Sequence, residues 1–148
     1  MKALKNTALA IAVLAAAGSF AAYAADVDPS SLYELSTEGT TRTIKAGEKG
    51  KLVIQITARP GAHISDEAPL KIELSGTRVK TEKENLTLAD SVAKKAEGQK
   101  YANPRFEVPL IANSAGHGSV DAKMTFFVCT ETICSRQKKT LSLPIEVQ

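Results

Sequence analysis

The sequence predicts an all-β fold, an immunoglobulin-like β-sandwich of antiparallel strands, and three observations predict it. Short segments in which apolar and polar residues alternate recur along the chain, which is the pattern of strands with one buried face. Clusters of Gly, Pro, Asn and Ser separate these segments and indicate turns. No stretch keeps the 3.6-residue periodicity of a long helix, so two packed antiparallel sheets are the architecture expected.

The first two dozen residues have the pattern of an export signal. Lys2 and Lys5 precede an apolar run from Thr7 to Phe20, and Ala22–Ala24 has the small-x-small sequence that signal peptidases cleave. The run is shorter than the roughly 20 residues that cross a bilayer as a helix. An uncleaved membrane anchor is the alternative.

We therefore expect residues 1–24 to be a signal peptide, cleaved before Ala25, and residues 25–148 to form a single periplasmic domain without a membrane span. Without the two lysines of the leader, 17 basic and 16 acidic residues remain, a net charge near +1. Such a balanced charge gives no reason to expect nucleic acid as a partner.

In the first half of the mature chain, alternation is clearest from Lys51 to Ala58, where Leu52, Ile54 and Ile56 share one face. The segment from Ala62 to Pro69 is expected to be irregular. Three further segments read as strands: 32–36, 41–45 and 70–74.

In the second half, residues 79–88 are ambiguous, and Asp90 to Asn103 is expected to be a polar connection between the two sheets. Phe106 to Ala112 reads as a strand. Ser119 to Val128 reads as a long strand, with Thr140 to Val147 as its hairpin partner.

The cysteines, Cys129 and Cys134, lie on this last hairpin, and two cysteines in an exported chain predict a disulfide. Even-numbered residues are apolar in 119–128, and odd-numbered residues are apolar in 140–147. Extending both alternations to the tip places both cysteines on the polar face, where we expect them to face solvent.

The two cysteines enclose only Thr130–Ile133. Closing so small a ring stabilises the fold by about 2 kcal/mol in the loop-entropy model, near the low end for disulfides. A weakly stabilising bond at a solvent-facing loop is the kind expected to exchange with other thiols. A purely structural clip is the alternative.

These residues resemble a known family. Phe127–Cys129, then Cys134, then Lys139–Pro144 resemble the closing hairpin of the N-terminal periplasmic domain of the thiol:disulfide interchange protein DsbD. Upstream, Pro60–Ile64 and Lys71–Leu74 fit the early region of that family. One departure is visible: Ser135 and the residues after it stand where family members often have Pro. A second departure is expected, because we expect a standalone domain without the membrane conduit and the thioredoxin-like domain of that family.

The resemblance implies that Cys129 and Cys134 are the catalytic residues and shuttle between dithiol and disulfide. A partner thiolate attacks one sulfur, a mixed disulfide forms, and the second cysteine resolves it. The implied partners are a thioredoxin-like protein or a membrane thiol reductase on one side and oxidised periplasmic proteins on the other. Phe127, the one apolar residue beside Cys129 on the polar face, is expected to shield or dock the disulfide, and packing on a neighbouring loop is the alternative. No cofactor is implied.

Other chemistries fit the sequence less well. His63, His117 and Met124 do not have the close spacing of zinc or copper ligands, so we expect no metal, a core position for Met124 and a solvated loop around His63. No serine lies in a nucleophile-elbow motif, which argues against a hydrolase. The main alternative function is a non-enzymatic periplasmic binding or assembly module, in which the Cys129–Cys134 disulfide is structural.

Overall fold

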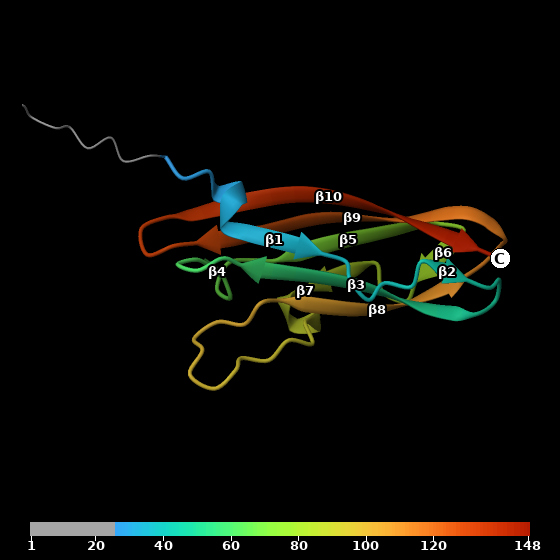
Figure 1. Cartoon of the computed structure of the whole chain (residues 1–148), viewed down its shortest axis with the longest axis horizontal. Helices are drawn as coiled ribbons and strands as arrows, with labels where there is room; N and C mark the ends of the chain where they lie inside the picture. The colour runs from blue at the N-terminus through green and yellow to red at the C-terminus, as the bar shows by residue number, and fades with distance from the viewer. Residues whose placement is uncertain (1–25) are drawn as a thin grey trace, which may run out of the picture.

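The computed structural model describes residues 26–148, so the expected signal peptide lies outside the described residues. The chain folds into two β-sheets packed face to face (Figure 1). The first sheet has the strand order β1-β3-β8-β6. The second has the order β2-β10-β9-β5-β7, and β4 also pairs with β9. The elements are η1 (Pro29–Leu32), β1 (Tyr33–Ser36), β2 (Thr43–Ile44), β3 (Lys49–Ala58), β4 (His63–Ile64), β5 (Lys71–Thr77), β6 (Val79–Thr81), β7 (Asn85–Thr87), η2 (Leu88–Asp90), β8 (Arg105–Ala112), β9 (Gly116–Cys129) and β10 (Cys134–Val147).

This architecture confirms the predicted all-β, immunoglobulin-like β-sandwich. The pairings are antiparallel, as predicted, with one exception in the described part of the chain: β2 runs parallel to β10. The parallel pair forms where the chain crosses from one sheet to the other. β1 pairs with β3 in the first sheet, and β2, the next strand along the chain, pairs with β10 in the second.

The core lies between the sheets and follows the predicted alternation. On β3 the inward residues are Leu52, Ile54 and Ile56, all fully buried. Phe126 of β9 meets Tyr33 edge-on, with ring centroids 4.9 Å apart. The other inward residues of β9 are Val120, Ala122, Met124 and Val128, each at most 2% exposed, so Met124 has the predicted core position.

Two expectations about local structure need correction. The ambiguous stretch 79–88 forms two three-residue strands, β6 and β7, one in each sheet. The segment 62–69, expected to be irregular, contains β4, which pairs with the end of β9. A strand of two residues is too short to show an alternation, so the sequence pattern did not reveal it.

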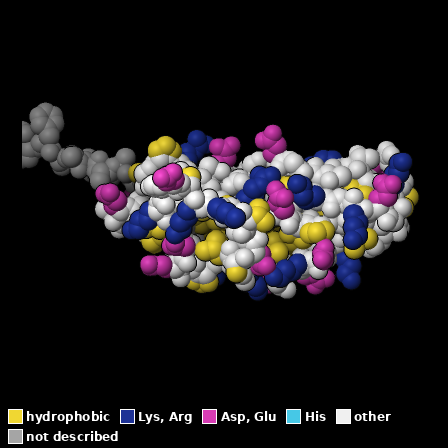
Figure 2. Space-filling view, turned by 90° about the horizontal axis from the view of Figure 1, so that it is seen from below, with side chains coloured by type: hydrophobic (Ala, Val, Ile, Leu, Met, Phe, Trp, Pro, Cys, Tyr) yellow, Lys and Arg dark blue, Asp and Glu magenta, His cyan; other side chains and the backbone are white. Residues whose placement is uncertain are grey.

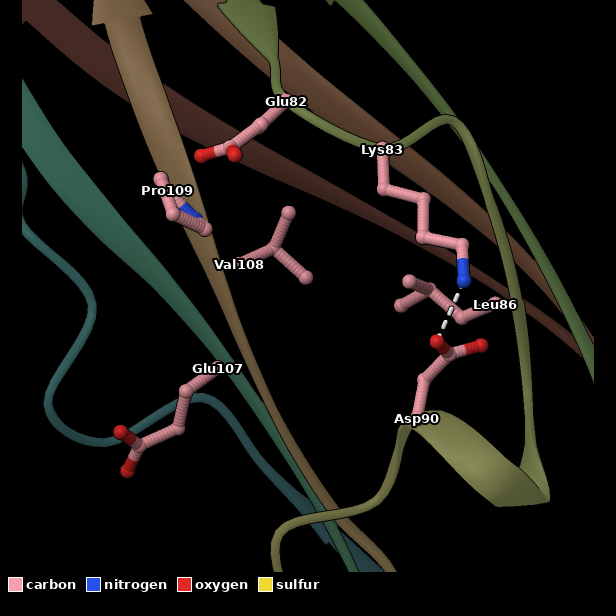
Figure 3. A pocket seen from close by; sticks show the side chains of 7 residues that line it. All are labelled: Glu82, Lys83, Leu86, Asp90, Glu107, Val108 and Pro109. Atoms are coloured by element: carbon pink, nitrogen blue, oxygen red, sulfur yellow. Dashed lines mark hydrogen bonds and ion pairs between the residues drawn. The ribbon is translucent and has the colours of Figure 1, made fainter.

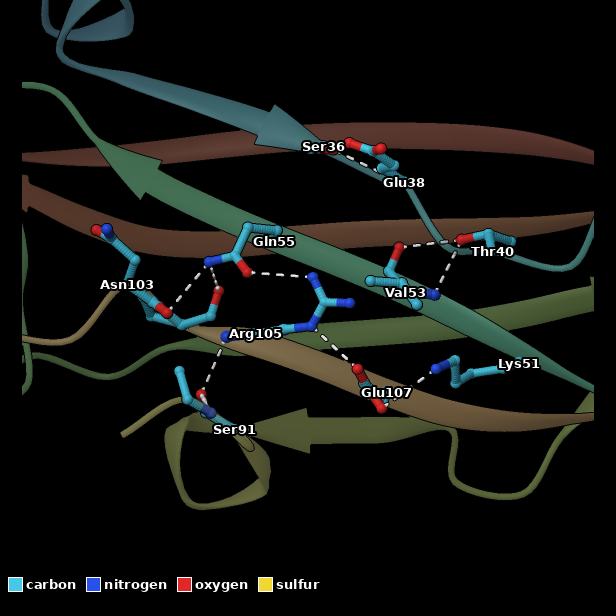
Figure 4. Close-up of polar contacts among 12 residues, drawn as sticks. Ser36, Glu38, Thr40, Lys51, Val53, Gln55, Ser91, Asn103, Arg105 and Glu107 are labelled. Atoms are coloured by element: carbon cyan, nitrogen blue, oxygen red, sulfur yellow. Dashed lines mark hydrogen bonds and ion pairs between the residues drawn. The ribbon is translucent and has the colours of Figure 1, made fainter. Parts of the chain in front are cut away.

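Residues 91–104 form the predicted connection between the sheets, leading from η2 to β8 (Figure 1). Figure 4 shows how it is anchored on the first sheet. The Asn103 side chain accepts a hydrogen bond from the Ala58 backbone N–H (3.0 Å), and Gln55 donates to the Asn103 carbonyl (3.2 Å). Ser91 accepts from the Arg105 backbone N–H (3.0 Å). Both ends of the connection are therefore fixed beside β3 and β8.

The outer face of the first sheet is polar and largely paired. Arg105 donates to Glu107 (3.0 Å), which also pairs with Lys51 (3.4 Å), and the hydrogen bond from Arg105 holds the pKa of Glu107 below its usual value. Val53 is fully buried on this face because Thr40 folds over it and exchanges two hydrogen bonds with its backbone (Figure 4). Arg105, Glu107 and Lys51 are thus paired with one another, and a hollow of about 520 Å³ that Arg105 also lines opens beside them.

Candidate functional site

The β9–β10 hairpin places the two cysteines opposite each other at its tip. The strands pair without a break from Gly116 and Val147 at the open end to Cys129 and Cys134 at the tip. The tip loop, Thr130–Ile133, is closed by a hydrogen bond from the Thr130 N–H to the Ile133 carbonyl (2.8 Å). Cys129 and Cys134 form a disulfide, as predicted, with their Cα atoms 4.0 Å apart.

The two sulfurs differ in their exposure. Cys134 is exposed, as expected, but Cys129 is only 2% exposed, so the expectation that both cysteines face solvent is wrong for Cys129. The register prediction holds, because Cys129 and Cys134 are direct partners. Cys129 is buried because β9 is a central strand at this point, flanked by β10 on one side and by β4 on the other.

A histidine completes a row of three residues across the sheet. His63 of β4 lies directly opposite Cys129, which lies directly opposite Cys134, so all three side chains leave the same face. The His63 ring stacks on Tyr101, with centroids 3.7 Å apart and planes 8° apart. The expected solvated loop around His63 is therefore wrong: His63 is half-buried in a short strand. Tyr101 has no sequence signal that singles it out.

Phe127 belongs to the next row on the same outer face, opposite Arg136. It is half-buried and lines a mainly apolar hollow of about 390 Å³ together with Pro69, Lys71, Thr125 and Arg136. This hollow lies one row away from the disulfide. Phe127 is thus placed beside the cysteine pair on an accessible surface, while Phe126 fills the core.

The charges around this face are mixed, with cations closest to the hollow. Lys71 forms an ion pair with Glu73 (2.7 Å), and that hydrogen bond lowers the pKa of the Glu73 carboxyl. Arg136 borders the hollow, and Lys138 follows it, exposed, two residues along β10. On the tip loop, Ile133 is 44% exposed. The face therefore offers apolar surface bordered by positive charge.

A second hollow, of about 330 Å³, opens on another side of the molecule, between β8 and the β6–β7 segment (Figure 3). Leu86 and Val108 lie at its base, and Lys83 pairs with Asp90 across its rim. The hydrogen bond from Lys83 and a second from the Thr87 N–H keep the pKa of Asp90 low. Figure 2 shows hydrophobic side chains in a hollowed part of the surface, with charged side chains around them. Of the three acids that line this hollow, Asp90 is paired with Lys83, and Glu107 is paired with Arg105 and Lys51.

The remaining histidine lies at the opposite end of the hairpin. The His117 side chain is 94% exposed and pairs with Glu146, its cross-strand neighbour. Within residues 26–148, no group of three His, Cys, Asp or Glu side chains is placed to hold a metal ion. Nor does any helix in that range have the length and apolar character needed to cross a membrane.

Comparison with protein-family models and with curated protein sequences finds no match. Among solved structures, the chain is similar to a conjugative transposon lipoprotein from Bacteroides eggerthii (TM-score 0.41, 9% identity, covering 77% of this chain and 96% of that one). It is also similar to a cohesin module from a family 33 glycoside hydrolase of Clostridium perfringens (TM-score 0.39, 7% identity, covering 78% of this chain and 95% of that one). A third similar structure is murine CRIg (TM-score 0.35, 9% identity, covering 78% of this chain and 98% of that one). None of these three is a DsbD domain. Likenesses at this level carry no functional information, and the β-sandwich assignment rests on the two packed sheets themselves.

Proposed function

We propose that the chain is a periplasmic thiol:disulfide exchange protein that relays electrons through the Cys129/Cys134 pair. The observation that carries this proposal is the position of the disulfide. It joins two residues that the β9–β10 ladder already holds opposite each other, on the outer face of one sheet, with one sulfur exposed. An immunoglobulin-type structural disulfide instead ties the two sheets together through the core. Here the bond adds little that the ladder does not supply.

The difference in exposure suggests the order of steps. A thiolate of the partner attacks the exposed Cys134 sulfur, the Cys129–Cys134 bond breaks, and Cys129 leaves as a thiolate. The second thiol of the partner then attacks the mixed disulfide and releases Cys134. Two electrons have passed from the partner dithiol to the pair, and the reverse sequence passes them to an oxidised periplasmic protein.

The surface around the pair supports docking of a protein partner. Ile133 and the hollow lined by Phe127 place apolar surface on either side of Cys134 along the hairpin. In this proposal Phe127 is a docking residue for a thioredoxin-like protein. The resemblance of the hairpin to that of DsbD supports the same class of partner, and a disulfide agrees with an oxidising, exported location.

Trapping the mixed disulfide tests the proposal. The probe is a thioredoxin-like protein that keeps only its attacking cysteine, activated as a mixed disulfide with a chromophoric small thiol. The Cys129→Ser variant, with Cys134 free and exposed, is expected to release the chromophore and form a covalent complex quickly. The matched Cys134→Ser variant, whose remaining thiol is buried, is expected to react much more slowly.

The wild-type protein provides the decisive comparison. We expect a reduced thioredoxin-like protein to reduce its disulfide at micromolar concentrations. If this protein leaves the disulfide intact while small dithiols reduce it only under forcing conditions, the relay is ruled out. The non-enzymatic binding or assembly module, with a structural Cys129–Cys134 disulfide, then replaces it.

A further inference from the structure

We propose that His63 is the proton donor and acceptor for Cys129 during thiol exchange. This inference rests on the proposed function, because it concerns the leaving group of the same reaction. It begins from the row His63–Cys129–Cys134, which places an imidazole on one side of the buried sulfur and the disulfide partner on the other.

The register places the His63 and Cys129 side chains next to each other on one face of the sheet. Residues directly opposite in an antiparallel pair have Cβ atoms about 4.5–5.5 Å apart, with their side chains on the same face. An imidazole nitrogen extends beyond its Cβ by enough to reach a neighbouring sulfur across that gap. The stack on Tyr101 restricts the ring, and the hydrogen bond from the Ala58 N–H to Asn103 fixes the chain two residues after Tyr101.

The exchange reaction needs a proton donor beside the Cys129 sulfur. When a partner thiolate attacks Cys134, both electrons of the S–S bond leave with the Cys129 sulfur, which becomes a thiolate in a nearly fully buried position. Burial disfavours a charged sulfur unless a proton or a cation is supplied. A protonated His63 transfers its N–H proton to this thiolate, which gives a neutral thiol and a neutral imidazole. In the reverse direction the neutral imidazole removes the proton before Cys129 attacks.

Charged groups of both signs lie around His63. Arg59 lines the hollow beside it, and Lys100 lies 5.2 Å from the centre of the Tyr101 ring. The pKa of Lys100 is raised, chiefly by its interaction with Tyr101 and further by the carboxylates of Glu67 and Asp66. Carboxylates, lysine, arginine and tyrosine change charge outside about pH 5–8, the interval in which histidine does.

The first test uses dithiothreitol, a small dithiol that needs no docking surface. We measure the rate of reduction from acidic to mildly alkaline pH and divide it by the fraction of dithiothreitol present as thiolate. In the wild-type protein this corrected rate is expected to fall as pH rises through the histidine range. His63→Gln is expected to lose that dependence and to react about a hundredfold more slowly at the acidic end.

His117→Gln is the matched control, because it removes the other histidine at the far end of β9 and is expected to keep the wild-type profile. Tyr101→Leu tests the positioning of the ring and is expected to weaken the pH dependence while His63 is still present. Thermal unfolding of each oxidised variant identifies any loss of fold. An unchanged corrected profile in folded His63→Gln overturns the inference.

The second test does not depend on exchange. In reduced Cys134→Ser protein, Cys129 is the single thiol, and its ionisation is followed by thiolate ultraviolet absorbance. Adding His63→Leu, which removes the N–H that the imidazole donates to the thiolate, is expected to shift this titration to higher pH, whereas adding His117→Leu is expected to leave it in place. An unshifted titration overturns the inference even if the partner reduces the disulfide. A shifted titration without reduction by a protein partner rejects the relay and leaves the His63–Cys129 proton pair standing.

Discussion

The two ends of the β9–β10 hairpin use the same two strands in different ways. Both ends bury apolar residues on the inner face. On the outer face, the open end carries His117, 94% exposed and paired with Glu146. At the tip, the outer face carries a nearly fully buried Cys129, and His63 opposite it is half-buried. Figure 1 shows β4 at this end, whereas the C-terminus lies at the other.

The difference shows how segments that pack beside a sheet lower the exposure of its outer face. The outer face of a sandwich is normally solvated, and at the open end it is. At the tip, β4 extends the sheet beyond β9, and Tyr101 from the 91–104 connection stacks on His63. The proposed function assigns exchange chemistry to this covered part of an otherwise solvated face. Substitutions on the two faces and at the two ends of the hairpin test this contrast, from the largest expected effect to the smallest.

The largest effect on stability is expected on the inner face at the tip. Phe126→Ala removes a fully buried ring that packs edge-on against Tyr33 and should lower the free energy of unfolding by about 3–5 kcal/mol. Phe127→Ala, one residue along the strand, should cost less than about 1 kcal/mol but slow reduction by a thioredoxin-like protein. Urea unfolding and exchange kinetics measure the two effects. An equally large stability loss in Phe127→Ala would make Phe127 a core residue.

At the open end, the strongest constraint is steric. A Cβ added to Gly118 would lie 2.5 Å from the backbone oxygen of Thr77 on the neighbouring strand. Gly118→Val should therefore cost about 3 kcal/mol, the upper part of the range for overpacking. Ser142→Ala, on the exposed outer face of β10, is the control and should leave the denaturation midpoint unchanged. A neutral Gly118→Val would show that β5 and β9 separate easily at this end.

Removing the disulfide is expected to cost less than either of these changes. Replacing Cys129 and Cys134 together by Ala should lower stability by about 2 kcal/mol, because the ring they close is small. Reduction of the wild-type protein should give the same loss in urea unfolding. A loss about twice as large or more would identify the bond as a structural clip and would weaken the relay.

The smallest effect is expected from the exposed ion pair at the open end. His117→Gln and Glu146→Gln should each leave the unfolding temperature and the exchange rate within error, since solvent and salt screen such a pair. Repeating the thermal scans at low and high salt checks the screening. A clear loss of exchange in His117→Gln would contradict the assignment of the chemistry to the tip alone.

The long alternating segments predicted most of the fold. Lys51–Ala58, Phe106–Ala112 and the two strands of the hairpin have enough residues for their buried faces to be recognised, and the structure confirms them. The placement of Cys129 and Cys134 on the same face of the hairpin followed from the same alternation. The burial of Cys129 could not be predicted, because it depends on β4, a strand of two residues whose pairing is set by the tertiary fold.

The His63–Tyr101 stack could not be predicted for a related reason. The two residues lie 38 positions apart in the sequence, on a short strand and on a loop without regular structure. Neither segment has a periodicity that fixes its orientation. The loop is anchored through the Asn103 and Ser91 side chains and the Asn103 carbonyl, and a residue pattern does not encode these contacts.

The reduction potential of the Cys129–Cys134 pair tests the central claim most directly. The oxidised and reduced protein are equilibrated with thioredoxin or glutathione buffers of known ratio, and the two forms are separated after the thiols are blocked. An exchanging pair at an exposed tip should equilibrate rapidly, with a potential above about −300 mV, in the range of thioredoxin-type couples. A potential below about −300 mV, as in structural disulfides, would contradict the account.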